Sequence, residues 1–578
     1  MNFSRMWSFR PIEWLLVILL LLAPVYFHPN IGGTGLRIPN NIIIWAMASL
    51  VGFYSLFKLS RSQHIVLPRY FMLLLAFPSL AFFSSTVSGV EIASQWTFRV
   101  LYIWGGVLFF FSLFQHDLKQ GRIDRLLFIV VLSGLIHSLF GLSQIIWLKQ
   151  LPSFLPVNPN GVPTGLFQQI NNQASFQVTS ILIALWLSSR PFIRKGPQWR
   201  FILLIIAMGC GAFVVSYSGS RVGALGFILA LPLLLLSRWQ TIKQEPKRIG
   251  LIVAVLIISV SSASMMESNR GLTSALEKSA AINAGFSGSA RLGMYAIALD
   301  VIKKEPLLGH GIGSFVRVWQ FGKPAFYAQH PDATLPAQRV AHPHNEIIFW
   351  LVEGGIVAVT GLVLCLIAVL FSLKRLPHSR RYAYAALILP ITLHTQVELP
   401  FYISSGHWFV FLLLLFVLFH PSHHRYQLKL SDAARYLIKG LAVCGALLSI
   451  VFLSHTMAAN LEFKRSLMKQ VPAGEEPFPI AMNNPYFKTL ASHTVMTSLL
   501  HSSIQYKLDE NVWLFAQWAE EELKYNPHIL FYRLTARAYT YLKQDDNLCK
   551  IGRKGKAIYP TDPLLIKVVE ICDKKSVP

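Results

Sequence analysis

Long apolar runs, separated by short polar segments, organise this chain. A run of about 20 apolar residues has the length that crosses a bilayer core as a helix. About thirteen such runs occur, which predicts an all-α polytopic membrane protein with about thirteen transmembrane helices. The runs cover residues 11–27, 40–57, 65–83, 96–114, 125–147, 174–189, 198–216, 222–237, 249–264, 346–372, 381–397, 406–420 and 434–456.

The first run resembles a secretory signal in following basic residues such as Arg10. A cleaved signal ends in small residues that suit the signal peptidase. This run ends instead in Ala23-Pro24-Val25-Tyr26, which is a poor cleavage site. We therefore expect residues 11–27 to be retained as a membrane helix.

Basic residues lie mainly in every second loop. The basic loops carry Lys58, Arg61, Lys119, Arg122, Arg125, Arg190, Arg194, Lys195, Arg200, Arg238, Lys243, Lys247, Arg248, Lys374, Arg375, Arg380, Arg381, Arg425, Lys429 and Arg435. The short loops of the other set carry only Arg37, Lys149 and Arg221. Because cytoplasmic loops retain Lys and Arg, this pattern predicts a cytoplasmic N-terminus. An odd number of helices then places the C-terminus outside.

Composition supports this class and excludes others. Hydrophobic residues make up 53% and charged residues 14% of the 578 positions, whereas soluble proteins carry about 25% charged residues. A soluble enzyme, a disordered chain and a fibrous repeat are therefore excluded. The net charge of +25 would suggest nucleic-acid binding in a soluble protein. Here the surplus is spread over many loops and forms no single patch, so we expect no nucleic-acid partner.

Two outer segments are too long to be simple connections, and long outer segments of membrane proteins tend to carry function. The sequence therefore divides into residues 1–264 with the first nine helices, the outer loop 265–345, residues 346–456 with the last four helices, and the outer tail 457–578.

Helical patterns fill the tail. One covers Asn511–Tyr525 and ends at Asn526-Pro527, and a second pair ends at Tyr559-Pro560, about 33 residues later. That spacing is near the period of helix-turn-helix repeats. A small helical cap and a surface that docks a protein partner both fit the pattern. Cys549 and Cys572 would pair in an oxidising compartment.

Two histidines flank a proline where the outer loop meets the tenth helix, in Ala341-His342-Pro343-His344-Asn345-Glu346. The same helix continues to Gly354-Gly355. An imidazole accepts a proton near neutral pH, so His344 is a candidate base for an attacking hydroxyl. A metal pair of His342 and His344 is the alternative, although the sequence offers no further ligands nearby.

Two arginines of the outer side are candidates for binding an anion. Arg221 lies in the turn Ser216–Gly223, within a loop set otherwise poor in basic residues. Arg291 opens a helical pattern that runs to Lys304 and stops at Pro306–Gly313. Guanidinium groups and helix N-termini both favour phosphate oxygens. A helix-end anchor explains either arginine alone, but together with a histidine they favour a phosphate-bearing substrate.

Amide and carboxylate side chains complete this outer face. Gly165–Asn172 includes Gln169 and Asn171 and precedes the sixth helix, where its amides either bind sugar or cap the helix. Glu398 follows the eleventh helix in His394–Tyr402. A carboxylate near the bilayer edge is costly unless it is paired or hydrated. We therefore expect Glu398 to hold His344 or an arginine in position.

These motifs resemble the O-antigen ligase superfamily of polytopic glycosyl-transferring enzymes. Within it the chain is similar to the bacterial protein O-oligosaccharyltransferases. The superfamily resemblance rests on His344-Asn345, Gly354-Gly355, Ser218–Arg221, and Arg291 followed by Pro306 and Gly309-x-Gly311. The branch resemblance rests on Asn30–Asn40, Gly165-x-Phe167-x-Gln169-x-Asn171, Glu398-x-Pro400 and the long tail.

The resemblance implies transfer of an oligosaccharide from an undecaprenyl-diphosphate carrier to Ser or Thr of a pilin-like or other periplasmic protein. It implies a multi-pass protein of the bacterial inner membrane, in contact with membrane lipid, whose outer loop and tail are periplasmic, and which uses no metal or other cofactor. The implied roles are as follows: His344 accepts the proton, Gln169 and Tyr402 assist, and Arg221 and Arg291 hold the diphosphate. The separate role of His342 stays open.

The sequence leaves two further functions open. A lipopolysaccharide O-antigen ligase or O-antigen polymerase belongs to the same superfamily, but a lipid acceptor needs little protein outside the membrane, which the tail of about 120 residues argues against. A transporter or flippase of lipid-linked sugar should show polar or broken helices near the midplane, often in repeated halves. The charges here cluster at one face and no internal repeat is found.

Overall fold

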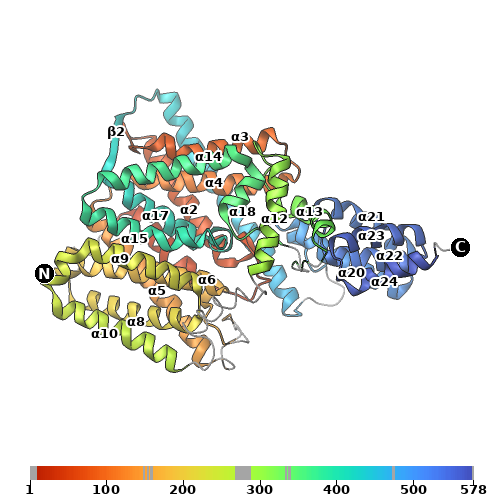
Figure 1. Cartoon of the computed structure of the whole chain (residues 1–578). Helices are drawn as coiled ribbons and strands as arrows, with labels where there is room; N and C mark the ends of the chain where they lie inside the picture. Colours follow the sequence, from red (N-terminus) through yellow and green to blue (C-terminus); the bar gives the residue numbers. More distant parts are fainter. Residues whose placement is uncertain are drawn as a thin grey trace. The chain divides into compact units, whose positions relative to one another are not determined.

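The computed structural model describes residues 9–147, 161–266, 288–331, 340–470 and 476–575, with residues 150, 152, 155, 156, 333 and 335 (Figure 1). Lys149, one of the few basic residues of the second loop set, lies outside the described residues. So do parts of the expected outer loop 265–345. Helices dominate the described chain.

These helices confirm the predicted fold class, an all-α polytopic membrane protein. The membrane-type region contains α1 (Pro11–Val17), η2 (Ile18–Leu22), η3 (Ala23–Val25), η4 (Gly35–Arg37), α2 (Pro39–Leu59), α3 (Phe71–Val87), α4 (Ala93–Phe114), α5 (Gln120–Ile146), η5 (Gly165–Phe167), α6 (Ile170–Ser188), α7 (Pro191–Arg194), α8 (Gln198–Ser218), α9 (Arg221–Gln244), α10 (Pro246–Met265), α14 (Glu346–Arg375), α15 (His378–His394), α16 (Pro400–Ile403), α17 (Ser405–Phe419), η7 (His420–Ser422) and α18 (Asp432–Leu467). The other helices are α12 (Gly288–Lys304), α13 (Phe315–Gln329), α19 (Pro479–Met482), α20 (Lys488–Tyr506), α21 (Asp509–Tyr525), α22 (Ile529–Tyr541), α23 (Asp545–Ile558) and α24 (Pro563–Lys575).

Nine helices of the described chain are long and apolar enough to cross a membrane, and each coincides with a predicted run. They are α2, α4, α5, α8, α9, α10, α14, α17 with its extension to Ser422, and α18. The four remaining runs are helical as well. Pro11–Val25 and α3 are apolar but shorter, while α6 and α15 carry more polar residues.

The prediction was wrong at the start of the run 65–83. Residues His64–Pro68 form strand β1, and the helix α3 begins only at Phe71. β1 pairs antiparallel with β2 (His423–Gln427), so that His64 lies opposite Gln427. This pair cannot be predicted from local sequence patterns because its two strands are more than 350 residues apart. Hydropathy alone does not distinguish an apolar strand from the beginning of a helix.

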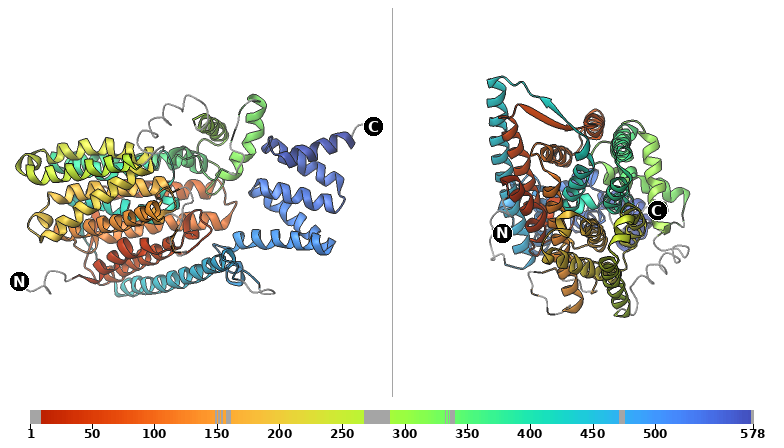
Figure 2. Two further views of the ribbon diagram at one scale, coloured as in Figure 1. Left: turned by 90° about the horizontal axis from the view of Figure 1, so that it is seen from below. Right: turned by 90° about the vertical axis from the view of Figure 1, so that its left-hand side faces the viewer.

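Contacts divide the chain into two compact units. The first contains Met1–Pro78, Leu101–Ala280 and Val363–Ile480. Its long helices run side by side (Figure 2), with α9 packed along α15, α2 along α18, and α8 against both α6 and α10. Small residues allow close approach here: a side chain at Gly105 of α4 would begin 2.7 Å from the ring of Trp45.

The second unit contains Ser79–Val100, Ala281–Leu362 and Ala481–Pro578. In its tail, each helix from α20 to α24 packs against the next one around a buried core (Figure 2). The helix patterns predicted to end before Pro527 and Pro560 are α21 and α23, which are followed by α22 and α24. A disulfide joins Cys549 of α23 to Cys572 of α24, with Cα atoms 5.7 Å apart. This is the pairing predicted for an oxidising compartment.

Candidate functional site

Two predicted amide residues of the first unit meet at the carboxylate of a third predicted residue, Glu398. Gln169 is the N-cap of α6, and its side-chain oxygen accepts a hydrogen bond from the backbone N–H of Asn172 at 3.2 Å. The Asn171 amide donates to Glu398 Oε2 at 3.0 Å, and Gln169 also hydrogen-bonds to Glu398. The fold therefore joins residues 227 positions apart in sequence. The amides of this segment both cap the helix and bind a carboxylate.

The same group reaches the turn that carries Arg221. Ser220 is the N-cap of α9: its oxygen accepts from the backbone N–H of Gly223 at 3.3 Å and its hydroxyl donates to Asn171 Oδ1 at 2.9 Å. Gly219 ends α8 in the left-handed conformation, which glycine tolerates best. Arg221 is the first residue of α9 and is exposed. The network around Glu398 thus fixes the backbone next to this guanidinium.

Buried residues that the sequence did not single out extend the network on its other side. His394 Nε2 lies 3.3 Å from Glu398 Oε2, and His394 Nδ1 lies 2.8 Å from the Ser175 hydroxyl. His407 Nε2 lies 3.1 Å from the same hydroxyl. All three side chains are almost fully buried. The signal that could have found them is a histidine inside the apolar run 406–420 and another at the end of the run 381–397, because such groups are costly without partners.

The surroundings of Glu398 decide its charge. Burial alone would raise the pKa of this carboxyl group, but the hydrogen bonds from His394, Asn171 and Gln169 and the charge of His394 outweigh burial and lower the pKa to about 2. The carboxylate is therefore ionised at neutral pH. So weak a base is a poor proton acceptor, and the geometry favours a role in which Glu398 positions its neighbours.

The low pKa predicts a pH dependence of stability. Because the folded pKa lies below the ordinary 4.5, the stabilisation is complete above about pH 5 and is lost as the pH falls towards 2. The difference corresponds to about 3 kcal/mol at most. We expect Glu398→Gln to be less stable than the wild type at pH 7 and to lose less stability between pH 5 and 3. Thermal unfolding of both purified proteins between pH 7 and pH 3 measures these stabilities. If the stability of both proteins changes equally with pH, the prediction is contradicted.

Tyr402 lies on the short helix α16, close to the aromatic residues of α4. Its ring stacks on that of Tyr102 with centroids 6.4 Å apart, and the Tyr102 hydroxyl donates to the backbone carbonyl of Phe401 at 2.6 Å. Tyr102 also stacks on Trp408 at 5.5 Å. These contacts place Tyr402 in the first unit, four residues beyond Glu398, and hold the backbone of α16 in place.

The two predicted histidines lie together in the second unit. Their rings are 4.4 Å apart, and His342 Nδ1 accepts a hydrogen bond from the backbone N–H of His344 at 3.3 Å. His344 has φ +54°, a left-handed conformation that is uncommon for a residue other than glycine and that tends to mark functional positions. Asn345 follows, and its side chain accepts from the backbone N–H of Ile348 at the start of α14. His344 thus lies directly before a helix N-terminus, and its backbone N–H is hydrogen-bonded to His342.

Among the described residues, no group of three or more His, Cys, Asp or Glu side chains is arranged to hold a metal ion. Arg291 is exposed near the beginning of α12. That helix ends at Lys304, as the sequence predicted. The predicted residues are therefore distributed over both units: Gln169, Asn171, Arg221, Glu398 and Tyr402 belong to the first, and Arg291, His342 and His344 to the second.

The Gly354-Gly355 motif is a break in α14. Gly355 has φ +62° and ψ −165°, so the helix stops and restarts there. The loop Pro306–Gly313 closes the break. The backbone N–H groups of His310 and Gly311 donate to the carbonyls before the break, and the carbonyls of Pro306 and Leu307 accept from the N–H groups after it, all at 2.9–3.1 Å.

A buried ion pair strengthens this junction. Glu353, directly before the break, lies 3.4 Å from an Arg99 nitrogen, and its side chain is only 2% exposed. The same carboxylate accepts hydrogen bonds from the backbone N–H groups of Gly313 and Phe315. The carboxylate therefore ties the end of the Gly309-x-Gly311 loop to the helix that begins next to His344.

Substitution of the glycines at the break tests this junction. A Cβ on Gly309 would lie 2.6 Å from the backbone nitrogen of Gly355, and both glycines have positive φ. Left-handed backbone costs other residues about 1–2 kcal/mol even without a clash. We expect Gly309→Ala and Gly355→Ala each to lower the free energy of unfolding by at least about 2 kcal/mol, measured by thermal unfolding.

The matched control is Gly440→Ala in α18, where no atom lies within 4 Å of an added Cβ. Alanine there favours the helix, so no loss of stability is expected. Equal melting temperatures for Gly440→Ala and Gly355→Ala would show that the break is not a constrained junction.

Comparison with known families adds two matches to this geometry. Residues 203–363 match a family model described as O-antigen ligase, and this range includes Arg221, Arg291, His344 and the break in α14. Residues 382–569 match a model described as virulence factor membrane-bound polymerase, C-terminal. The matches support the O-antigen ligase superfamily. No curated protein matches the chain.

The two family matches support a membrane enzyme that transfers a lipid-linked glycan. Together with the apolar helices they support a multi-pass protein of the inner membrane. Members of this family act as glycosyltransferase-like ligases and polymerases. The acceptor and the roles of single residues go beyond these matches.

Proposed function

We propose that the protein is an O-oligosaccharyltransferase, which moves an oligosaccharide from undecaprenyl diphosphate to Ser or Thr of a pilin-like or other periplasmic protein. The observation that carries the proposal is His344. It is held in a left-handed conformation directly before the N-cap of α14, inside the segment that matches the O-antigen ligase model. Strain of this kind persists where surrounding structure enforces it, as at reactive positions.

The reaction is a single displacement. The acceptor hydroxyl oxygen forms a bond to the anomeric carbon of the glycan, and the bond from that carbon to the diphosphate oxygen breaks with its electron pair leaving on the diphosphate. His344 accepts the hydroxyl proton. Arg221 and Arg291 bind the diphosphate and neutralise the charge that develops on it. Attack from the opposite side inverts the anomeric centre.

The network of the first unit serves this reaction by holding Arg221. Glu398 binds Asn171, which accepts the Ser220 hydroxyl at the N-cap of α9. Backbone N–H groups at that helix N-terminus and the adjacent guanidinium both favour phosphate oxygens. Tyr402, Gln169 and His342 assist in substrate binding in this proposal.

The second part of the proposal is that the acceptor of the glycan is a protein. A protein acceptor accounts for the helical tail with its disulfide, since oxidising conditions suit a periplasmic domain and since helix pairs of this kind offer surfaces for proteins. The N-terminus is then cytoplasmic and the C-terminus periplasmic, as the basic loops predict. The second candidate is an O-antigen ligase or polymerase, which the match of residues 382–569 to the polymerase model favours.

The structure changes one argument against a transporter. A broken helix was expected of a transporter, and α14 is broken at Gly355. Its freed backbone groups are hydrogen-bonded to the Pro306–Gly313 loop. The break is therefore occupied by protein backbone and not by a transported ligand.

His344→Ala tests the proposed base. In cells that make a lipid-linked glycan and a pilin-like acceptor, the wild-type protein should raise the acceptor mass by one glycan. Loss of a positioned base should reduce the rate of this transfer at least about 100-fold. Intact-mass spectrometry of the acceptor measures this transfer, and an immunoblot of the enzyme shows that both variants are expressed equally. Unchanged glycosylation of the acceptor by His344→Ala would refute the role of His344 as the base. Glycan found on lipopolysaccharide instead of the acceptor protein would favour the second candidate, an O-antigen ligase.

Arg221→Lys tests the diphosphate contact. Lysine keeps the charge but loses the two-pronged geometry that matches phosphate oxygens. We expect a loss of about tenfold in kcat/KM for the lipid-linked donor, which corresponds to about 1.4 kcal/mol. The matched control is Arg425→Lys, on the exposed strand β2, which should transfer as the wild type does. Full activity of Arg221→Lys would remove the proposed contact.

A further inference from the structure

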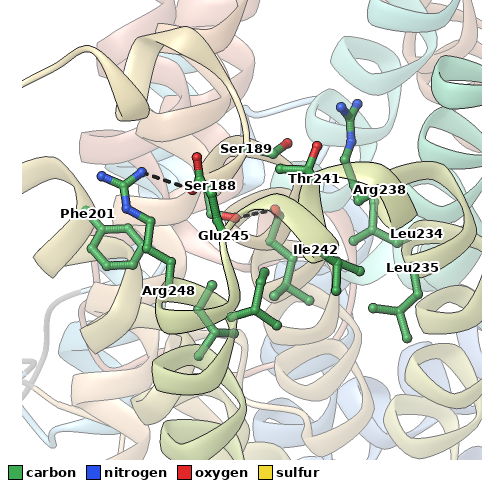
Figure 3. Close-up of a pocket in the computed structure, with 13 residues that line it drawn as sticks. Ser188, Ser189, Phe201, Leu234, Leu235, Arg238, Thr241, Ile242, Glu245 and Arg248 are labelled. Carbon is green, nitrogen blue, oxygen red and sulfur yellow. Dashed lines mark hydrogen bonds and ion pairs between the residues drawn. The ribbon is translucent and has the colours of Figure 1, made fainter.

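A pocket lies at the opposite end of α9 from Arg221 (Figure 3). Residues of α6, α8, α9 and α10 line it. Its walls are mainly apolar and its rim carries hydroxyl and charged groups. The apolar residues are Leu185, Phe201, Leu234, Leu235, Ile242, Ile249 and Ile252, and the others are Ser188, Ser189, Arg238, Thr241, Glu245 and Arg248.

The distance along α9 separates this pocket from the proposed transfer chemistry. Arg221 and Arg238 are 17 residues apart on one helix, which corresponds to about 26 Å at 1.5 Å per residue. The hydrocarbon core of a bilayer is about 30 Å thick. The pocket therefore lies at the other membrane face from Arg221, on the side of the basic loops.

Exposed tryptophans place the pocket at the level of lipid headgroups. Trp239, next to Arg238, is 57% exposed, and Trp199 of α8 is 38% exposed. Lys243 lies over the Trp239 ring at 5.2 Å. Tryptophan is enriched where the hydrocarbon meets the headgroups, with basic residues beside it. A ligand in this pocket would have its polar part at the headgroup level and an apolar part towards the bilayer core.

The charge around the rim is strongly positive. Segments 188–201 and 238–249 contain eight Lys and Arg residues and a single acid, Glu245. Glu245 forms an ion pair with Arg194 and lies 3.4 Å from Arg248. The second distance exceeds the 2.7–2.9 Å of a close charge-assisted hydrogen bond. The Arg248 guanidinium also lies over the ring of Phe201 at 5.1 Å, and its five N–H donors exceed what these two contacts use.

Arg238 adds positive charge beside the pocket. Its guanidinium lies over the buried ring of Trp186 at 3.7 Å, and the guanidinium of Arg190 lies over the same ring at 5.2 Å. Arg190 also pairs with Asp124 at 3.2 Å. Stacking on one tryptophan holds Arg238 in place beside the pocket, while Asp124 compensates Arg190.

We propose that this pocket binds an anionic phospholipid. Its phosphate is bound by Arg248 at the rim, Arg238 adds positive charge beside the pocket, and one acyl chain lies against the leucine and isoleucine side chains between α6, α9 and α10. Charge complementarity selects an anion, and the apolar walls at headgroup depth select a lipid over a free anion. The inference is independent of the proposed transfer reaction.

The test uses the delipidated full-length protein in detergent and two probes, dioleoyl phosphatidylglycerol and dioleoyl phosphatidylcholine. Native mass spectrometry counts bound lipid. We expect one tightly bound phosphatidylglycerol, with an affinity at least about tenfold higher than that of phosphatidylcholine, and no displacement by equimolar glycerol 3-phosphate.

Arg238→Gln/Arg248→Gln should reduce this preference to about twofold or less. Lys429→Gln, which changes a basic loop residue away from the pocket, should retain it. Equal binding of both lipids by the wild type, or a preference that survives in the double variant, would overturn the proposal. Displacement by glycerol 3-phosphate would also overturn it, because the pocket would then bind a free anion. The comparison of lipids on the wild type needs no variant to fold.

Discussion

The constraint on which this structure depends is that polar groups inside a membrane protein need partners within the protein. Water is absent from the hydrocarbon core, and an unsatisfied backbone group there costs several kcal/mol. The break in α14 shows how the chain meets this requirement. The Pro306–Gly313 loop forms hydrogen bonds with the carbonyls of Val352 and Glu353 before Gly355 and with the N–H groups of Ile356 and Val357 after it, and Gly309 permits the close approach. Gly354-Gly355 and Gly309-x-Gly311, which are separate motifs in the sequence, therefore form one junction in the structure.

The same constraint explains the network around Glu398. Its carboxylate is mostly buried, and it is ionised because amide and imidazole groups surround it. An ionised carboxylate in turn orders the amide of Asn171 and, through it, the Ser220 N-cap. Buried charge is costly by itself, but a fully hydrogen-bonded network specifies one arrangement. The consequence is a hydrogen-bonded turn next to Arg221, which suits the proposed binding of a diphosphate without reorganisation.

Hydropathy predicted the fold well because each transmembrane helix satisfies its own backbone and needs only length and apolar side chains. Each predicted run corresponds to helix in the structure apart from a few residues at run ends, and the largest difference is at the start of the run 65–83, where strand β1 (His64–Pro68) pairs with a strand far away in sequence. The candidate residues Gln169, Asn171 and Glu398 were recognised as polar groups at a membrane edge. That they bind one another was not foreseeable, nor was the participation of His394, Ser175 and His407, because contacts between distant segments leave no periodic signal.

By itself, the sequence determined the class of the protein, the positions of its helices, the pairing partners Cys549 and Cys572 and the polar residues that are candidates for a functional site. An apolar run, or a histidine before a helix, can be recognised from the residues next to it in sequence, so local sequence is enough to predict it. Only the tertiary structure decided that the partners of Glu398 are Asn171 and His394, that Gly355 interrupts a helix, and that Arg238 and Arg248 border an apolar pocket. Each of these depends on which segments are packed together, and packing brings groups hundreds of residues apart within hydrogen-bonding distance.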